Sequence, residues 1–283
     1  MSAPLTLLHC ADKTLDLTRP VVMGVLNVTP DSFSDGGRFF SPEAAVEQGL
    51  RMATEGAAII DVGGESTRPG SEGVSEAEEL RRVIPVIERL RAATSAVISI
   101  DTSKPAIIRA AAAAGAGLVN DVRALREPGA LEALAATGCA VCLMHMQGEP
   151  RTMQLAPHYH DVLGEVRAFL AARAAACRAA GIEAQRLAVD PGFGFGKTVE
   201  HNLTLLRQLQ QLAGDGLPVL VGLSRKSMLG TLTGRPAGER LAGSVALAVI
   251  AALNGASIIR AHDVAPTVDA LKLVAAVQGS QGS

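Results

Sequence analysis

Residues 96–122 read AVISIDTSKPAIIRAAAAAGAGLVNDV, and this stretch contains one complete repeat of the fold. It opens with an apolar run that ends on Asp101, continues into a helix-forming segment that begins near Pro105, and closes at Gly115. A second apolar run follows at 117–122. Near-continuous apolar runs are typical of strands that are buried on both faces. A helical crossover between two of them predicts that they pair in parallel.

The same unit recurs along the chain. We predict eight strands, at 21–28, 57–64, 96–103, 117–122, 140–146, 186–192, 217–224 and 256–262. Amphipathic segments such as 41–56 and 75–93 lie between them, and the second opens with Ser75 and Glu78 in capping-box spacing. Glycines are expected to end many of the helices, at Gly56, Gly115, Gly138, Gly181 and Gly255. Eight such units without a break in composition favour a closed (β/α)₈ TIM barrel, an α/β fold, over an open doubly wound sheet.

The whole chain, residues 1–283, is predicted to form one domain, because no linker or low-complexity segment interrupts it. Residues 1–20 are interpreted as an N-terminal β-hairpin that covers the barrel floor, and residues 279–283 as a short flexible tail.

Composition and charge exclude several classes of protein. The net charge of −2 argues against nucleic acid as a partner, and no apolar run is long enough to suggest a membrane span. The N-terminus lacks the basic region of a signal peptide, so we expect a cytoplasmic protein. Cys139 and Cys142 form a CAVC pair, but positions three apart on a strand point to opposite faces, and no second pair completes a zinc site. We therefore expect buried, reduced thiols.

Each predicted strand ends on a polar or charged residue. The ends are Asn27, Asp61, Asp101, Asn120, His145, Asp190, Ser224 with Lys226, and Arg260 with His262. In a TIM barrel the carboxyl ends of the strands and the loops after them build the active site. Taken singly, each has a simpler explanation: Asp101 or Ser103 as a helix cap, and Asp190 as a turn residue. Eight together favour a common mouth.

Residue spacing divides this mouth into two parts. Gly222, Ser224 and Lys226 share one strand face if strand geometry persists that far, as do Arg260 and His262, so one rim offers several cations to a phosphate or diphosphate. Asp101, Asn120 and Asp190 offer acceptors to a heterocycle that carries N–H donors. The sequence therefore indicates a ligand with both groups.

The segment DPGFGFGKT at 190–198 is not a Walker A loop, because Gly192 and Gly196 enclose three residues instead of four. Of its two aromatic residues, Phe193 and Phe195, we expect one to pack beneath the loop and the other to stack on a flat ligand.

Eight segments together resemble the dihydropteroate synthase family of pterin-binding TIM barrels. They are GVLNVTPDSFSDGG, IIDVGGESTRPG, ISIDTSK, VNDV, LMHMQG, DPGFGFGK, VGLSRKS and IIRAHDV, in order between positions 24 and 264. The resemblance implies a transferase of folate biosynthesis that joins 4-aminobenzoate to 6-hydroxymethyl-7,8-dihydropterin diphosphate. The products are 7,8-dihydropteroate and pyrophosphate. It also implies sulfonamides as competitive inhibitors and a homodimer.

The family's residue roles carry over by motif. Asn27 would bind Mg²⁺ on the diphosphate, and the pterin would be held by Asp101, Asn120, Asp190 and Lys226. Arg260, His262 and Thr67 would face the diphosphate, and the aminobenzoate position would be lined by Arg68, Pro69, Phe195 and Ser224. Met144 and Gly222 are also expected to contact a substrate. The residues expected to be catalytic are Asp35, Asp101, Lys226 and Arg260.

The segment NVTPDSFSDGG at 27–37 fits a loop that closes over an SN1-like cation, with Asp31 or Asp35 stabilising positive charge. Two alternatives remain open. One is a pterin-binding methyltransferase, which would need neither the diphosphate seat nor Asn27; the other is a pterin-binding paralogue without turnover.

Overall fold

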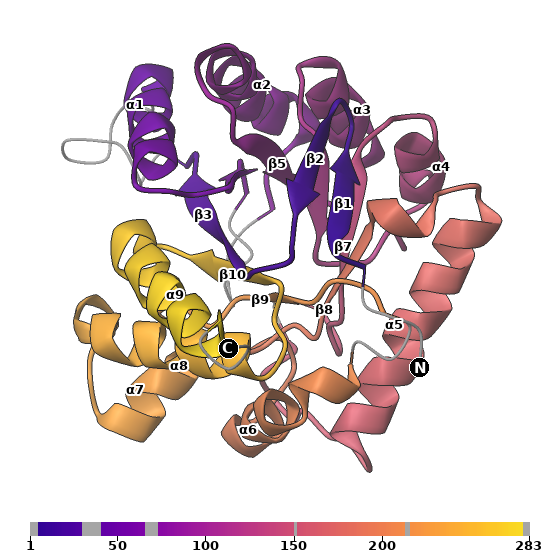
Figure 1. Cartoon of the computed structure of the whole chain (residues 1–283). Helices are drawn as coiled ribbons and strands as arrows, with labels where there is room; N and C mark the ends of the chain where they lie inside the picture. Colours follow the sequence, from indigo (N-terminus) through magenta and orange to yellow (C-terminus); the bar gives the residue numbers. More distant parts are fainter. Residues whose placement is uncertain (1–4, 30–40, 66–72, 150–151, 213–215, 280–283) are drawn as a thin grey trace.

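The computed structural model of the protein describes residues 5–29, 41–65, 73–149, 152–212 and 216–279. It is an α/β fold in which a ring of parallel strands is surrounded by helices (Figure 1). The strands are β1 Leu7–Cys10, β2 Lys13–Asp16, β3 Val21–Asn27, β4 Ile59–Gly63, β5 Val97–Asp101, β6 Leu118–Asp121, β7 Ala140–Met144, β8 Leu187–Asp190, β9 Leu220–Val221 and β10 Ile258–Ala261.

The α-helices of the described residues follow the strands of the ring in turn. They are α1 Pro42–Thr54, α2 Glu76–Ala93, α3 Pro105–Ala113, α4 Ala130–Ala135, α5 Val162–Ala179, α6 Val199–Arg207, α7 Ser227–Thr233, α8 Leu241–Leu253 and α9 Val264–Gly279. Short 3₁₀ turns lie at Ala184–Arg186, Leu209–Gln211 and Ala237–Glu239. None of the helices among the described residues is long and apolar enough to cross a membrane.

The ring is closed. The sheet runs in the order β8-β7-β6-β5-β4-β3-β10-β9, and a parallel bridge between Val189 and Val219 joins its two edges. Closure leaves no open sheet edge, which is the arrangement of a TIM barrel. The predicted (β/α)₈ barrel is confirmed.

The predicted strands are all present but shorter than expected at their carboxyl ends. The largest difference is β9, expected over 217–224 and observed as Leu220–Val221. Arg225 adopts φ of +58°, so strand geometry does not continue to Lys226, which precedes α7 as its N-cap. Four of the five predicted helix-closing glycines have positive φ, between 85° and 103°, but Gly138 does not, so that prediction was wrong for Gly138.

Local sequence explains where the helices begin. The Ser75 side chain accepts from Glu78 N–H at the start of α2, as capping spacing predicts. At α3 the N-cap is Lys104, which makes no side-chain cap bond, and Pro105 occupies the first turn. Asp101 and Ser103 therefore do not cap that helix, so the simpler explanation is wrong for both.

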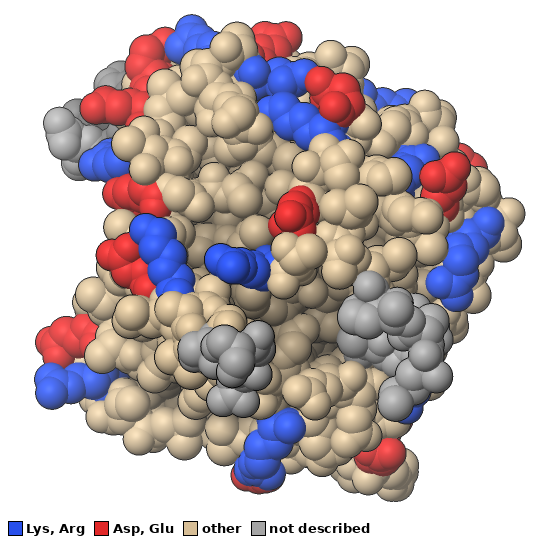
Figure 2. Space-filling model, viewed as in Figure 1, with Lys and Arg blue, Asp and Glu red and all other residues tan. Residues whose placement is uncertain are grey.

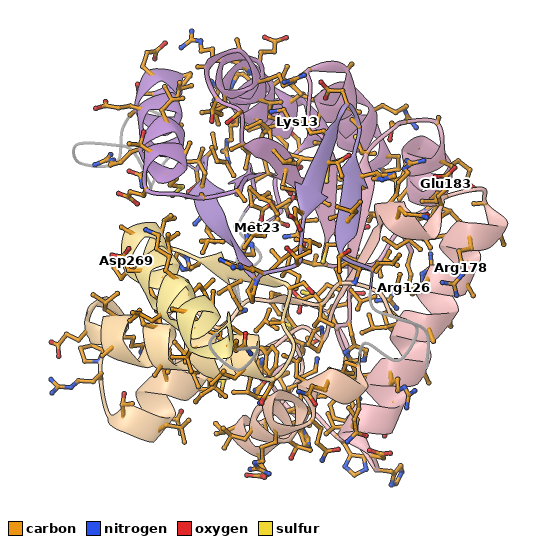
Figure 3. All side chains as sticks on the ribbon, viewed as in Figure 1. Lys13, Met23, Arg126, Arg178, Glu183 and Asp269 are labelled. Atoms are coloured by element: carbon orange, nitrogen blue, oxygen red, sulfur yellow. The ribbon has the colours of Figure 1, made fainter. Side chains whose placement is uncertain are left out.

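The N-terminal hairpin covers the floor of the barrel, as predicted. β1 and β2 pair antiparallel with Leu8 opposite Leu15, and both side chains are buried. They pack in one cluster with the first inward-facing residues of the barrel strands, among them Met23 and Ile59. Viewed from this side, the hairpin crosses the ring of strands, and Met23 lies near the middle of the molecule (Figures 1 and 3).

Lys13, at the start of β2, connects the hairpin to the segment that precedes β5, at the floor end of the barrel. Its Nζ donates to Ala96 O at 2.7 Å and Ser95 O at 3.0 Å, beyond the end of α2. On the face around the hairpin, acidic and basic side chains are interspersed, in keeping with the small net charge (Figure 2). The hairpin is therefore held both by apolar packing and by these hydrogen bonds.

The four cysteines are free and buried. Cys142 faces the barrel interior, whereas Cys139 packs in the layer between strands and helices. The prediction that the CAVC pair points to opposite faces is confirmed.

Candidate active site

The interior of the barrel changes from apolar to polar along five of its eight strands. The lowest layer, next to the hairpin, contains Met23, Ile59, Val97, Leu118, Ala140, Ala188, Leu220 and Ile258. Successive side chains alternate between faces, so the residues two positions further along the strands form the next inward layer. That layer includes Asp61, Ser99, Asn120, Asp190 and Arg260. A dry floor thus supports a polar mouth.

Asp61 joins three neighbouring positions of this polar layer. Its carboxylate accepts from Ser99 Oγ at 2.6 Å, Asn120 Nδ2 at 3.0 Å and Arg260 Nε at 2.7 Å. One N–H of the Asn120 amide is used by Asp61, so the carbonyl oxygen and the second N–H of Asn120 are left for a ligand.

Arg260 crosses the barrel. Its Nη2 donates to Asp101 Oδ2 at 2.9 Å, although β3 and β4 separate β10 from β5 in the sheet. Burial opposes the charge of Arg260, but Asp61 and Asp101 hold its pKa above the ordinary value. The contact can only pass through the interior, so the ends of distant strands meet at one mouth.

Asp101 has a carboxylate oxygen without a partner. Among the buried side-chain nitrogen and oxygen atoms that the structure describes, Asp101 Oδ1 is the one without a hydrogen-bond partner. The side chain is 9% exposed, and burial raises its pKa to about 7 although Arg260 opposes the shift. A buried, unpaired acceptor is costly, so its retention points to a ligand that donates to it.

Asp190 supplies a second buried carboxylate at the same mouth. Burial raises its pKa to about 6, against the lowering effects of Gly192 N–H, Lys226, Lys197 and Arg260. Its Oδ1 accepts from Gly192 N–H at 2.7 Å. The turn role that was the simpler explanation is therefore real, but it occupies one lone pair of one oxygen and leaves the carboxylate further acceptor capacity.

An apolar platform lies beside the carboxylates. Phe195 packs against a cluster formed by Val122, Met144, Met146 and Met153. Phe193, in contrast, is 1% exposed and belongs to the main core. The two aromatic residues of the loop therefore divide as expected, Phe193 packing beneath it and Phe195 at the mouth.

Lys226 lies over the Phe195 ring, with Nζ 4.2 Å from its centroid. Burial and the nearby Arg260 lower the pKa of Lys226 to about 8, against the raising effects of Asp190 and Asp101. Lys226 thus reaches the carboxylates of the mouth even though strand geometry ends before it.

Asn27, at the end of β3, faces the gap above Gly63. A Cβ added to Gly63 would lie 3.7 Å from both Asn27 Oδ1 and Asp101 Cβ, so glycine leaves that space open. No three His, Cys, Asp or Glu side chains among the described residues could hold a metal ion together. Mg²⁺ commonly binds through one or two protein oxygens plus substrate phosphates and water, and a single amide oxygen fits that pattern.

Ser224 and His262 form the rim at β9 and β10. The Ser224 hydroxyl lies 3.1 Å from His262 Nδ1 and accepts from His262 N–H at 3.2 Å. Gly222 lies beside Arg260: a Cβ added to Gly222 would be 3.8 Å from Arg260 Cβ, an ordinary contact distance. The predicted residues of this rim are therefore adjacent.

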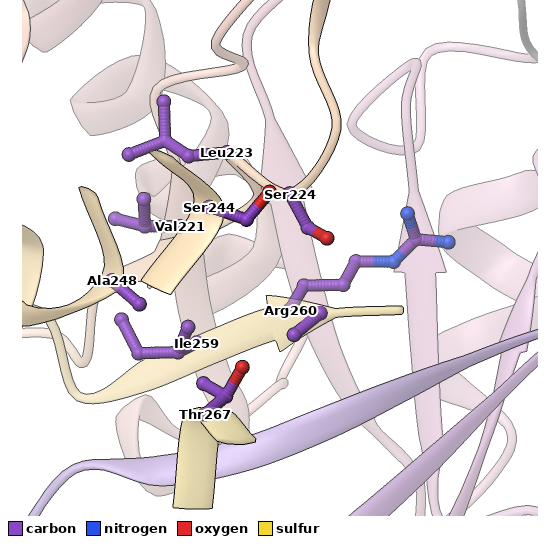
Figure 4. A pocket seen from close by; sticks show the side chains of 9 residues that line it. Val221, Leu223, Ser224, Ser244, Ala248, Ile259, Arg260 and Thr267 are labelled. Atoms are coloured by element: carbon purple, nitrogen blue, oxygen red, sulfur yellow. The ribbon is translucent and has the colours of Figure 1, made fainter. Parts of the chain in front are cut away.

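A small cavity lies behind this rim, between the strands and helices α8 and α9. Its lining residues are Val221, Leu223, Ser224, Ser244, Ala248, Ile259, Arg260, Ala261 and Thr267. In the close view the guanidinium of Arg260 extends away from the apolar wall of Ala248 and Ile259 (Figure 4). The functional end of Arg260 therefore serves the barrel mouth and not this cavity.

His145 does not join the mouth. It is buried against Phe169, with ring centroids 5.0 Å apart, and its Nδ1 lies 3.0 Å from Lys197 Nζ. Since β7 ends at Met144, His145 has left the inward-facing series, and its inclusion among the mouth residues was wrong. The predicted residues Asp35, Thr67, Arg68 and Pro69, with Asp31, lie outside the described residues.

Three residues of the site had received no role from the sequence. Asp61 was noted only as a strand end, and Ser99 and Lys197 were not noted. Ser99 carries a usable signal, a lone polar residue inside an apolar strand, two positions before Asp101 and hence on the same face. Lys197 carries none, because its burial depends on how the glycine loop folds.

Comparisons with known proteins agree on one family. The family model for "Pterin binding enzyme" matches residues 23–262. A dihydropteroate synthase of Escherichia coli strain K12 is 56% identical over 263 residues, which are 93% of this chain and 93% of that protein.

Solved structures match over nearly the whole chain. The Yersinia pestis dihydropteroate synthase, in complex with a sulfonamide drug, has a TM-score of 0.92 and 53% identity, covering 96% of this chain and 99% of that chain. The Xanthomonas albilineans enzyme with 4-aminobenzoic acid has a TM-score of 0.91 and 56% identity, covering 96% and 98%. The X. albilineans enzyme in complex with 7,8-dihydropteroate has a TM-score of 0.87 and 54% identity, covering 96% of this chain and 98% of that chain.

Proposed function

The chain belongs to the dihydropteroate synthases, within the pterin-binding enzymes, and we propose that the buried carboxylates of its barrel mouth bind the pterin half of the substrate. The family consists of transferases of folate biosynthesis. The reaction joins 4-aminobenzoate to 6-hydroxymethyl-7,8-dihydropterin diphosphate and gives 7,8-dihydropteroate and pyrophosphate. Related structures contain 4-aminobenzoic acid, 7,8-dihydropteroate and a sulfonamide drug, and sulfonamides are the expected competitive inhibitors.

The observation that carries the residue assignment is the unpaired Oδ1 of Asp101. A pterin presents several N–H donors on one edge, and one of them would satisfy this oxygen. Asp190 would accept two parallel hydrogen bonds from the amino-pyrimidine edge, and the free carbonyl of Asn120 supports a further contact. Lys226 would donate to the ring, and Met144 would contact the flat face of the heterocycle.

The rim formed by Ser224 and His262, beside Arg260, suits the diphosphate group and 4-aminobenzoate. We assign Arg260, His262 and Thr67 to the diphosphate. The aminobenzoate position is assigned to Ser224, Arg68, Pro69, Phe195 and Gly222. Support from the described residues is the adjacency of Ser224, His262 and Arg260. The roles of Thr67, Arg68 and Pro69 rest on the sequence motif alone.

The proposed mechanism is SN1-like. The C–O bond to the diphosphate breaks and leaves its electron pair on pyrophosphate, and the remaining methylene becomes a cation conjugated with the ring. The amine of 4-aminobenzoate then forms the new C–N bond and loses one proton. Asp101 and Asp190 stabilise positive charge on the ring, while Arg260 stabilises the negative charge that develops on the leaving group. Asp35 would add negative charge from the loop at 27–37, and closure of that loop would exclude water.

We assign Mg²⁺ to Asn27 Oδ1 together with diphosphate oxygens. The ion would neutralise charge on the leaving pyrophosphate. The open space above Gly63 and the oxygen donor support this assignment.

The function is tested by following pyrophosphate release. We expect release of pyrophosphate together with 7,8-dihydropteroate when both the pterin diphosphate and 4-aminobenzoate are present. No release with both substrates, or release without formation of 7,8-dihydropteroate, would contradict the proposed function. Methyl transfer from a methylated folate would instead favour the methyltransferase alternative, and pterin binding without turnover would favour the paralogue.

We further propose a cytoplasmic homodimer. Of the eight large apolar side chains that are exposed in the described part of the chain, six lie on α7, α8 and α9: Leu232, Leu241, Ile250, Leu253, Leu273 and Val277. A concentration of apolar side chains on consecutive helices is typical of an interface. The free, buried cysteines support a reducing compartment.

A further inference from the structure

The glycine loop at 192–196 is pressed against the chain that follows β7. Gly192, Gly194 and Gly196 have φ of +68°, +78° and +63°. A Cβ at Gly192 would lie 1.9 Å from His145 O, and one at Gly196 would lie 2.4 Å from Gln147 O. The loop therefore has one tight conformation that requires glycine at these positions.

Lys197 lies beneath this loop and is 3% exposed. Its Nζ is 3.0 Å from Gly192 O, 3.0 Å from Phe195 O and 3.0 Å from His145 Nδ1. Nζ also lies 3.4 Å from His145 O, so four acceptors surround the three N–H donors of an ammonium group. Burial lowers the pKa of Lys197 to about 7, whereas Asp190 raises it and favours the ammonium form. Burial and Lys197 lower the pKa of His145 to about 3, which keeps the ring neutral and Nδ1 available as an acceptor.

Two of these acceptors belong to the loop that carries the apolar wall of the mouth. Phe195 contacts Lys226 through its ring, and Gly194 lies against the Lys226 stem, where an added Cβ would be 3.3 Å from Cδ. Asp190, at the start of the same turn, accepts from Gly192 N–H. A change in the loop would therefore move Phe195 and Lys226 relative to Asp190.

We infer that Lys197 is a positioning residue for the pterin site: its buried ammonium holds the carbonyls of Gly192 and Phe195 and thereby sets the distance between the apolar wall and the Asp190 carboxylate. It reaches the substrate only through the loop, since its three donors are used inside the protein. This inference rests on the proposed assignment of Asp190, Phe195 and Lys226 to the pterin.

Replacement of the ammonium by an apolar group of similar length tests the inference. In Lys197→Met we expect the KM for the pterin diphosphate and the Kd for 7,8-dihydropteroate to rise about tenfold, as for the loss of one hydrogen bond to a charged group. The KM for 4-aminobenzoate should rise less. Leu8→Ala at the barrel floor is the matched control, because it lowers stability without touching the loop.

A purely structural Lys197 would give the same pattern as Leu8→Ala: a lower melting temperature and an unchanged pterin KM. That result would overturn the inference. If Lys197→Met does not fold, Tyr159→Phe decides, because the Tyr159 hydroxyl donates to Gly196 O at 2.9 Å and its loss relaxes the same loop. A raised pterin KM in Tyr159→Phe supports the inference, and an unchanged one overturns it.

Asp190→Asn, assayed in parallel, separates the two levels of the argument. If Asp190→Asn leaves pterin binding unchanged, the proposed pocket is wrong. If Asp190→Asn weakens pterin binding and Lys197→Met does not, the pocket stands and the role of Lys197 is wrong.

Discussion

Asp190 presents a carboxylate of raised pKa to a ligand whose recognition depends on neutral N–H donors. The charged carboxylate is the better acceptor. Burial raises the pKa of Asp190 and so opposes binding, whereas Lys226 and Lys197 lower this pKa and favour binding. At Asp101, burial raises the pKa and Arg260 lowers it. At the scale of single residues, the cations beside these carboxylates favour their ionised form and so oppose the effect of burial.

Asp190→Asn should weaken 7,8-dihydropteroate binding by about tenfold or more, because an amide offers one acceptor oxygen where the carboxylate offers two. Titration calorimetry measures the change. Glu200→Gln, on the exposed surface of α6, is the matched control and should bind as the wild type does. Wild-type affinity in Asp190→Asn would contradict the assignment.

The affinity for 7,8-dihydropteroate should fall as the pH decreases through about 7 and about 6, the raised pKa values of Asp101 and Asp190. The sign follows because protonation removes an acceptor that the bound ring requires. This product carries no diphosphate, so phosphate ionisation does not contribute to the profile. Binding that stayed constant between about pH 5 and 8 would show that these carboxylates do not contact the ring.

Asn27→Ala should raise the Mg²⁺ concentration required for half-maximal turnover, because the ion loses its protein oxygen. Circular dichroism should report an unchanged fold. Asn254→Ala removes an amide that donates to Leu206 O, far along the chain from β3, and provides the control. Equal turnover at limiting Mg²⁺ would remove Asn27 from the metal site.

At the scale of elements, the hairpin and the glycine loop have separate tasks at opposite ends of the barrel. The hairpin buries Leu8, Cys10, Leu15 and Leu17 against the floor layer. The loop, in contrast, buries one large side chain, Phe193. It is held by hydrogen bonds that Lys197 and Tyr159 donate to its carbonyls and by one that Gly194 N–H donates to Asn202 Oδ1. The first element contributes stability and the second contributes geometry.

Leu8→Ala should lower the free energy of unfolding by about 2–5 kcal/mol, since Leu8 is fully buried and the floor cannot close over the lost volume. Denaturant unfolding measures the loss. Leu155→Ala, at an exposed position, should cost much less. A small effect at Leu8 would mean that the hairpin is dispensable for the barrel.

At the scale of the whole molecule, the exposed apolar side chains are concentrated on one side. Helices α7, α8 and α9 follow one another around the ring, and α8 packs on α9 (Figure 1). This side lies behind β9 and β10, whose ends carry Ser224, Arg260 and His262. An interface there would support the rim from outside.

If the proposed homodimer uses this side, the double variant Leu273→Asp with Val277→Asp should have a monomer mass at concentrations where the wild type has a dimer mass. Both side chains are exposed on α9, and charges there oppose apolar association. Sedimentation equilibrium measures the mass. Leu155→Asp, which lies on none of these three helices, is the control. A double variant of dimeric mass would place the interface elsewhere.

Local sequence was sufficient for much of this fold. Strand periodicity located every strand of the ring, and the positions of Asp61, Asp101 and Arg260 at strand ends predicted that they meet at one mouth. The β9 end and Gly138 were misjudged, because the dihedral angles after a strand or helix are set by the contacts of the loop and not by the composition of the segment. His145 was misjudged for the same reason, since one residue beyond the strand end reverses the face.

The sequence by itself determined the eightfold repeat, the hairpin at the barrel floor and the residue types that meet at the mouth, because hydrophobic periodicity is a local property. Only the tertiary structure decided which of these residues bond to one another. The bond from Arg260 across the barrel to Asp101 and the contact between Lys197 and His145 join segments far apart in the chain. The unpaired Oδ1 of Asp101 likewise became apparent only in the folded barrel. Such contacts depend on barrel closure, which no single segment encodes.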